Sequence, residues 1–282
     1  MRRALVLVAV VTVLVAGIGI YVAVTRFPHQ LPIPLPRACE ARTDTGSVKL
    51  NVDQMANAAT IAAVGLTRGL PDRAVVVALA TALQESELTN LAGGDRDSIG
   101  LFQQRPSQGW GTAEQVRDPR YAANAFYNQL VRVRGWEEMR VTEAAQLVQR
   151  SAYPEAYETW AVDAQVLGDA LVGAASGAVM CSRAGEPTLR GAAAAQALGA
   201  GMRLDWGELG TVDNAEVLGL VLPAAEARAG WQYAHWLVAH SFEKNVQRVR
   251  FGDQQWSAES GVWSQVETGG VTGLVVAEVF RD

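Results

Sequence analysis

The sequence predicts a mainly α protein in three parts: an N-terminal transmembrane helix, an all-α segment and a small C-terminal α+β domain. The first observation is the apolar stretch from Ala4 to Val24. The second is the helical spacing of apolar residues through the middle of the chain. The third is a change in pattern beyond residues 173–188, a segment rich in Gly, Ala and Ser, after which strand-like runs appear.

The apolar stretch follows Arg2 and Arg3 and, as a helix, spans roughly 30 Å, the thickness of a bilayer core. A cleaved signal peptide shares these features, but its apolar core is usually about 7–15 residues, and no clear Ala-x-Ala site precedes Arg26. We therefore expect residues 1–25 to anchor a single-pass protein in the cytoplasmic membrane. The two arginines hold the N-terminus in the cytoplasm and the bulk is extracytoplasmic. Secretion after cleavage is the alternative.

Residues 26–37 are rich in proline, which disfavours helix and predicts an extended stalk. Cys39 and Cys181 are the only cysteines, and both fall in the exported part. They bracket the all-α segment, residues 38–182, so we expect a disulfide between them, with two free thiols as the alternative. No Cys-x-x-Cys spacing indicates redox catalysis.

Charge and histidine spacing exclude two classes of function. The net charge is −5, and no long basic run offers a footprint for nucleic acid. His235 and His240 are five residues apart, which does not match a helical metal pair, and no acidic or Cys residues cluster with them. We expect neither a metal nor a cofactor.

Within the all-α segment, apolar residues recur at helical spacing from Asn51 to Arg68. The next helix starts at Leu70-Pro71-Asp72, and nearly every residue from Ala74 to Leu83 is apolar, as in a buried central helix. The remaining expected helices begin near Pro119 and cover 142–149 and 154–172.

The C-terminal domain, residues 188–282, has no role that its sequence reveals. We expect an amphipathic helix over 224–242, a hairpin over 246–257 and a last strand over 271–280. Its aromatic residues suggest a surface that docks either an envelope protein partner or the first domain. They are Trp231, Trp236, Trp256 and Trp263.

Glu85 is the strongest candidate for chemistry. It lies at the exit of the apolar helix, where burial raises the pKa of a carboxyl group, as a general acid at neutral pH requires. Glu87 points about 200° away and is expected in solvent. On spacing alone, the favoured interpretation is that Glu85 only marks the polar end of a helix.

A resemblance favours the catalytic interpretation. Gln84-Glu85-Ser86, then Gly100-Leu101-Phe102-Gln103, then Asp118-Pro119 and Phe126 to Leu130 resemble the successive motifs of the soluble lytic transglycosylase and goose-type lysozyme superfamily. Residues 94–96 ahead of Ile99 are particularly similar to goose-type lysozymes, and the resemblance covers about residues 55–165. It implies a lysozyme-like domain and cleavage of peptidoglycan between N-acetylmuramic acid and N-acetylglucosamine.

The resemblance also assigns residues. It makes Glu85 the catalytic acid and gives Ser86 a structural hydroxyl. Gly100, Leu101 and Gln103 fall on the turn that lines the cleft, with Gln103 as a contact to sugar or to Glu85.

The second carboxylate is where the sequence departs from goose-type lysozymes. Asp95 matches the first of two water-positioning aspartates, whereas the second falls near Arg105. Asp97 is a substitute candidate. Inverting hydrolysis needs a base about 6.5–9.5 Å from the acid, whereas a lytic transglycosylase works with one glutamate.

The family has a later Tyr-Asn-Ala-Gly motif, and residues 146–154 stand in its place with an altered sequence. Tyr153 is the candidate to replace the tyrosine of that motif. The reaction type therefore stays open between the two. Several aromatic residues are candidates to stack on sugars, although helical spacing is more typical of core; we favour only Trp110. The set is Trp110, Tyr121, Tyr127, Trp136, Tyr157 and Trp160.

Two functions follow from these observations. The first is a membrane-tethered glycosidase acting on peptidoglycan. The second is a catalytically inactive lysozyme-like module that binds cell wall or scaffolds an envelope secretion or conjugation machine, which the Arg105 and Tyr153 departures favour.

Overall fold

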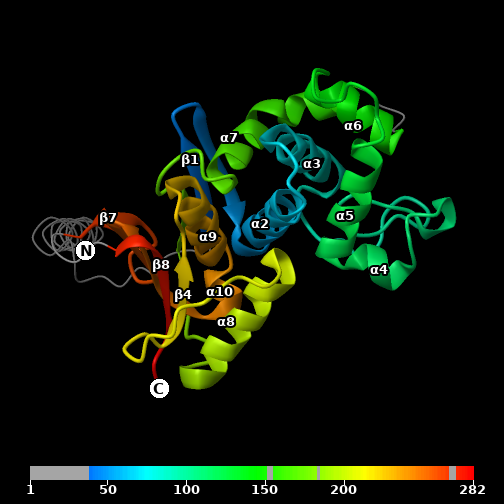
Figure 1. Ribbon diagram of the computed structural model, residues 1–282. Helices are drawn as coiled ribbons and strands as arrows, with labels where there is room; N and C mark the ends of the chain where they lie inside the picture. The colour runs from blue at the N-terminus through cyan, green and yellow to red at the C-terminus, as the bar shows by residue number, and fades with distance from the viewer. Residues whose placement is uncertain (1–37, 151–154, 183–184, 267–270) are drawn as a thin grey trace, which may run out of the picture. The chain divides into compact units, whose positions relative to one another are not determined.

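The computed structural model describes residues 38–150, 155–182, 185–266 and 271–282 (Figure 1). The expected anchor, residues 1–25, and the expected stalk, residues 26–37, lie outside the described residues. Within the described ranges, none of the helices combines the length and apolarity needed to cross a membrane.

The expected fold class is wrong. The protein is α+β, with 47% helix and 19% strand, and it contains a three-stranded and a five-stranded antiparallel sheet. The segment expected to be all-α carries the three-stranded sheet, in the order β2-β1-β3. Its strands are β1 (Ala38–Thr43), β2 (Gly46–Asn51) and β3 (Val179–Ser182).

This first sheet forms because short strands alternate between buried and exposed residues. Cys39 and Ala41 are buried on β1, and Val48 and Leu50 on β2, as a sheet with one packed face requires. β3 comes from some 140 residues further along the chain and pairs with β1 so that Cys39 lies opposite Cys181. No local pattern reveals that pairing.

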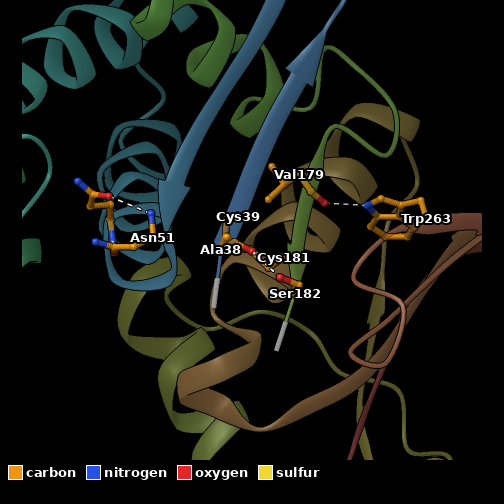
Figure 2. The surroundings of a disulfide bond; sticks show 8 residues. Ala38, Cys39, Asn51, Val179, Cys181, Ser182 and Trp263 are labelled. Atoms are coloured by element: carbon orange, nitrogen blue, oxygen red, sulfur yellow. Dashed lines mark hydrogen bonds between the residues drawn. A yellow bond between two sulfur atoms is a disulfide. The ribbon is translucent and has the colours of Figure 1, made fainter. Parts of the chain in front are cut away.

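The predicted disulfide is confirmed: Cys39 and Cys181 are bonded across β1 and β3 (Figure 2). Both cysteines are 2% exposed. Figure 2 also shows the indole of Trp263, from the C-terminal part of the chain, donating a hydrogen bond to the backbone oxygen of Val179 at 2.8 Å. The disulfide therefore joins the two ends of the segment expected to be the first domain.

Helices of the same segment pack around α3 (Asp72–Ser86), and every residue of α3 from Ala74 to Leu83 is buried, which confirms the expected central helix. α3 contacts α2, α5, α6 and α7. The helices are α2 (Val52–Thr67), α4 (Ala113–Arg117), α5 (Pro119–Leu130), α6 (Val141–Gln149) and α7 (Ala161–Leu171), with short 3-10 turns η1 (Pro106–Gln108) and η2 (Ala156–Trp160).

The C-terminal part builds the five-stranded sheet, in the order β4-β8-β5-β6-β7. The expected helix, hairpin and last strand are present, and α8, β4, α10 and β7 are additional. Its elements are α8 (Gly191–Trp206), β4 (Gly219–Pro223), α9 (Ala227–Ala239), α10 (Ser241–Lys244), β5 (Val246–Gly252), β6 (Gln254–Ser257), β7 (Trp263–Gln265) and β8 (Val271–Val279).

The two parts pack against each other directly. α9 contacts β5 and β8 of its own sheet and also α2, which lies between α3 and α9 in Figure 1. The buried carboxylate of Asp205 on α8 links the same two helices. It accepts a hydrogen bond from Thr60 of α2 and another from the indole of Trp236 of α9, both at 2.8 Å. Asp205 also forms an ion pair with Arg120 of α5. The described residues form one compact unit.

Candidate functional site

Glu85 lies in the last turn of α3, at the point where the buried central helix reaches the surface. The helix ends at once, because Glu87 and Leu88 both adopt left-handed backbone conformations (φ 50° and 59°). Glu85 is partly exposed, while Glu87 is exposed. The helix therefore presents one half-buried carboxyl group and one solvated carboxyl group, two residues apart.

Burial raises the pKa of Glu85 above its ordinary value of 4.5. Two hydrogen-bond partners oppose the effect of burial. The hydroxyl of Tyr157, on η2, donates to Oε1 of Glu85 at 2.7 Å, and the amide of Gln149 also hydrogen-bonds the carboxylate. The balance leaves a carboxyl group that holds its proton more tightly than a glutamate in water.

Tyr157 and Gln149 fix where the Glu85 carboxyl group lies. Tyr157 has no exposed surface, so its ring is held by packing and its hydroxyl is aimed at the carboxylate. Gln149, at the end of α6, donates through Nε2 to the backbone oxygen of Phe102 at 2.7 Å. The acid is thereby coupled to the turn that contains Phe102.

That turn, residues 100–103, is held against the end of α3. The hydroxyl of Ser86 donates to the backbone oxygen of Leu101 at 2.8 Å, and the ring of Phe102 stacks on Phe126 of α5 with centroids 4.9 Å apart. Leu101 and Phe102 have no exposed surface. The turn is thus a packed part of the fold beside Glu85.

Gly100 is required by this geometry. It has a φ of 79°, and a Cβ there would lie 2.4 Å from the backbone oxygen of Val116, so no other residue fits without a backbone shift. Gln103 also has a positive φ, of 46°, and its amide donates to the oxygen of Gly100 at 3.1 Å. Gln103 therefore braces the turn, and no hydrogen bond joins it to Glu85 within the described residues.

The two aspartate candidates have different surroundings. Asp97 pairs with Nε of Arg105 at 2.8 Å and accepts hydrogen bonds from the backbone and hydroxyl of Ser107. These contacts, the Arg105 guanidinium foremost, hold the pKa of Asp97 well below its usual range. Asp95 has a side chain that is 89% exposed. Asp97 thus holds the start of η1 in place. Its partner is Arg105, which stands near the position where the resemblance leads one to expect the second carboxylate.

A pocket of ≈ 630 Å³ lies next to Gln149, between the ends of α5 and α6 and the loop after η1. Trp110, the aromatic residue favoured for sugar stacking, is partly exposed and lines it. Tyr127 and Tyr157 are fully buried, and Trp136 is 3% exposed, so these three belong to the core. The pocket is lined by Gln108, Gly109, Trp110, Gln129, Arg132, Val133, Leu147, Val148, Gln149 and Arg150.

The structure thus brings together Glu85, Ser86 and the turn with Gly100, Leu101 and Gln103. Tyr153 lies outside the described residues. Sequence reasoning missed the two hydrogen-bond partners of Glu85, Tyr157 and Gln149. Both follow α5 within the region of resemblance, but they lie 72 and 64 residues from Glu85, and only the packing of α6 and η2 on α3 identifies them.

In comparisons with known proteins, no family model matches the chain, and no curated protein matches it.

Proposed function

We propose that this protein is a glycosidase that cleaves peptidoglycan glycan strands with Glu85 as its general acid. The observation that carries the proposal is the half-buried Glu85 carboxyl group, whose pKa is raised by burial and whose position is set by Tyr157 and Gln149. A general acid must keep its proton near neutrality and still reach its substrate, and this setting favours both. The proposed lysozyme-like relationship rests on the motif series around Glu85.

Of the two reactions that the resemblance implies, we propose transglycosylation. Hydrolysis with inversion needs a carboxylate base held at a fixed distance from the acid, but Asp97 is engaged by Arg105 and Ser107, and the 89% exposed side chain of Asp95 is not held in place by packing. In the lone-acid route, Glu85 protonates the glycosidic oxygen as the bond breaks, with the acetamido group of the substrate assisting. The Glu85 carboxylate then takes the proton of the substrate's 6-hydroxyl while that oxygen closes an anhydro ring, so the enzyme ends protonated as it began.

We further propose that the site works outside the cytoplasm, beside the membrane to which residues 1–25 would tether it. The Cys39–Cys181 disulfide supports this address, because such bonds persist in oxidising compartments.

The test is digestion of purified sacculi by the full-length protein and by the Glu85→Gln variant. We expect the wild type to release soluble muropeptides and the variant to be slower by about 10²–10⁴-fold, the usual contribution of a general acid. Glu87→Gln is the matched control: it removes an exposed carboxylate two residues away and should leave the rate unchanged.

Product ends distinguish the reactions. Anhydromuramic ends support transglycosylation, and reducing ends mean hydrolysis. Equal release by Glu85→Gln would refute the catalytic assignment. Binding to sacculi without release by the wild type would instead support an inactive module that binds cell wall or scaffolds an envelope machine.

A further inference from the structure

The pocket beside Gln149 has a size suited to a ligand and is connected to the proposed acid through that residue, although Glu85 itself does not line it. Its volume of ≈ 630 Å³ is within the range of roughly 300–1,000 Å³ typical of small-molecule sites. Gln149 belongs both to the pocket lining and to the hydrogen-bonding surroundings of Glu85. A ligand in the pocket would therefore lie next to the group that holds the acid in place.

The charge of the pocket is opposite to that of the protein. The chain has a net charge of −5, yet the pocket lining contains Arg132 and Arg150 and no Asp or Glu. Both arginines are exposed, and none of the ion pairs between described residues includes either of them. An anion could thus bind Arg132 and Arg150 without displacing a carboxylate of the described residues from either arginine.

The uncharged lining suits a sugar. Gln108 and Gln129 supply amide groups that both donate and accept hydrogen bonds, as hydroxyl and acetamido groups require. Trp110 supplies an apolar ring face. Together with the arginines, these groups match a carbohydrate that also carries carboxylates.

A structural explanation accounts for part of this arrangement. Arg132 and Arg150 lie just past the ends of α5 and α6, where a cation stabilises a helix by about 0.3–1 kcal/mol. That effect explains a positive charge at each helix end, but it does not require that both charges line one pocket from which acidic residues are missing. The experiment must therefore separate ligand binding from helix stabilisation.

We propose that Arg132 and Arg150 bind the carboxylates of the glycan strand, those of the lactyl groups or of the attached peptides, and so select peptidoglycan over neutral polysaccharides. The proposal rests on the proposed function, since it assumes a glycan substrate at Glu85. Neutral amino-sugar polymers offer hydroxyl and acetamido groups only, whereas each muramic acid adds a carboxylate, either on its free lactyl group or on the peptide that is joined to that group. The two arginines are specificity residues, distinct from the acid that breaks the bond.

The test measures binding by calorimetry to the full-length Glu85→Gln variant, which should leave the ligand uncut. The probes are a peptidoglycan tetrasaccharide with one free lactyl carboxylate and one muramic acid that carries its peptide, and the same molecule with every carboxylate converted to an amide. We expect the acidic probe to bind about five- to tenfold more tightly, as one or two exposed ion pairs would give. Adding Arg132→Gln and Arg150→Gln should remove that preference.

Three controls make the result specific. Arg132→Lys with Arg150→Lys keeps the charge and should retain most of the preference. Arg134→Gln removes an exposed arginine that does not line the pocket and should change nothing. Raising the salt concentration should weaken binding of the acidic probe alone, because exposed ion pairs are screened. Thermal unfolding of each variant reports the helix-end effect separately.

The outcomes of the two proposals are distinguishable. An unchanged preference in the double glutamine variant, with cleavage by the wild type, would overturn this inference and leave the proposed function standing. An arginine-dependent preference in a protein whose wild type does not cleave sacculi would support the binding site and refute the glycosidase. Equal binding of both probes by the Glu85→Gln protein with its arginines intact would overturn the inference.

Discussion

At the scale of single residues, Tyr157 and Tyr127 make an informative pair. Both have no exposed surface and both donate a hydrogen bond through the hydroxyl, but Tyr157 donates to Glu85 at 2.7 Å and Tyr127 to the backbone oxygen of Ile61 at 3.0 Å. Only the first of these hydrogen bonds bears on the proposed acid.

We therefore predict that Tyr157→Phe shifts the pH dependence of activity. The Tyr157 hydroxyl favours the ionised carboxylate and lowers the pKa of Glu85, so its removal raises that pKa further. Because the acid must be protonated, the alkaline limb of the kcat profile should move to higher pH. Tyr127→Phe should lose about 1 kcal/mol of stability, as Tyr157→Phe does, without moving that limb. An unshifted limb in Tyr157→Phe would contradict the assignment of Glu85.

Glu85→Gln should also alter the pH dependence of stability. Because the pKa of Glu85 is raised in the folded state, the folded protein binds this proton more tightly than the unfolded chain does. The wild type consequently loses stability as pH rises from 4.5 toward the folded-state pKa, and below 4.5 the carboxyl group is protonated in both states. Relative to the wild type, the variant should be more stable at pH 7 than at pH 4. The measurement is thermal unfolding of both proteins at the two pH values.

At the scale of elements, one hydroxyl makes a direct hydrogen bond between α3 and the turn at residues 100–103. Ser86 donates to the oxygen of Leu101, a residue with no exposed surface, and also to Ala82 within the helix at 3.1 Å. Without the hydroxyl, the Leu101 oxygen loses the hydrogen bond that links the turn to the helix. Helix α3 and the turn would then be held together by apolar packing and by Gln149, which hydrogen-bonds Glu85 and the backbone oxygen of Phe102.

Ser86→Ala is predicted to cost about 1–3 kcal/mol, the usual penalty for leaving a buried acceptor unpaired. Hydrogen exchange should quicken at the amides of Ile99 and Gln104, which bond to each other across the turn. Thr81→Val is the comparison, because the Thr81 hydroxyl donates only to Val77 within α3. Faster exchange in both variants, or in neither, would mean that Ser86 does not hold the turn.

Elements also show which patterns can be interpreted locally. The all-apolar run of α3 and the apolar spacing of α5 predicted helices that the structure confirms. The β1–β2 hairpin was missed although Cys39, Ala41, Val48 and Leu50 alternate with polar residues, because the strands are six residues long and lie beside strong helical patterns. α8 was missed because its many Ala and Gly residues give no clear contrast between an apolar and a polar face, so residues 191–206, just beyond the expected boundary at 173–188, were assigned no element.

At the scale of the whole molecule, Asp205 connects the two sequence-defined parts. Its carboxylate has no exposed surface and meets Arg120 of α5, Thr60 of α2 and Trp236 of α9. Nε2 of His240 lies 3.6 Å from the same carboxylate. Because α5 and α2 belong to the part that carries Glu85, these contacts of Asp205 hold the C-terminal part against the helices that pack on α3.

Asp205→Asn is predicted to destabilise the protein by about 3–5 kcal/mol, because it leaves Arg120 without its buried counter-ion. Glu40→Gln, which breaks the surface pair with Arg42, should cost at most about 1 kcal/mol. Chemical denaturation of the wild type, followed by tryptophan fluorescence and by circular dichroism, should show one shared transition. Two separate transitions, with only one moved by Asp205→Asn, would show that the parts unfold independently.

By itself, the sequence determined the helices with strong apolar periodicity, because these depend on residue type and spacing within a short stretch, and the disulfide, because only two cysteines are present. It nominated Glu85 through the ordered series of motifs over residues 55–165, and that assignment stays a prediction. The tertiary structure alone decided the pairing of β1 with β3, the approach of Tyr157 and Gln149 to Glu85, and the engagement of Asp97 by Arg105. The pairing and the approach join residues far apart in the chain, and the Asp97 contact depends on how a loop folds back on itself. Burial and hydrogen bonding are properties of such contacts, so the chemistry of Glu85 follows from packing that no local pattern encodes.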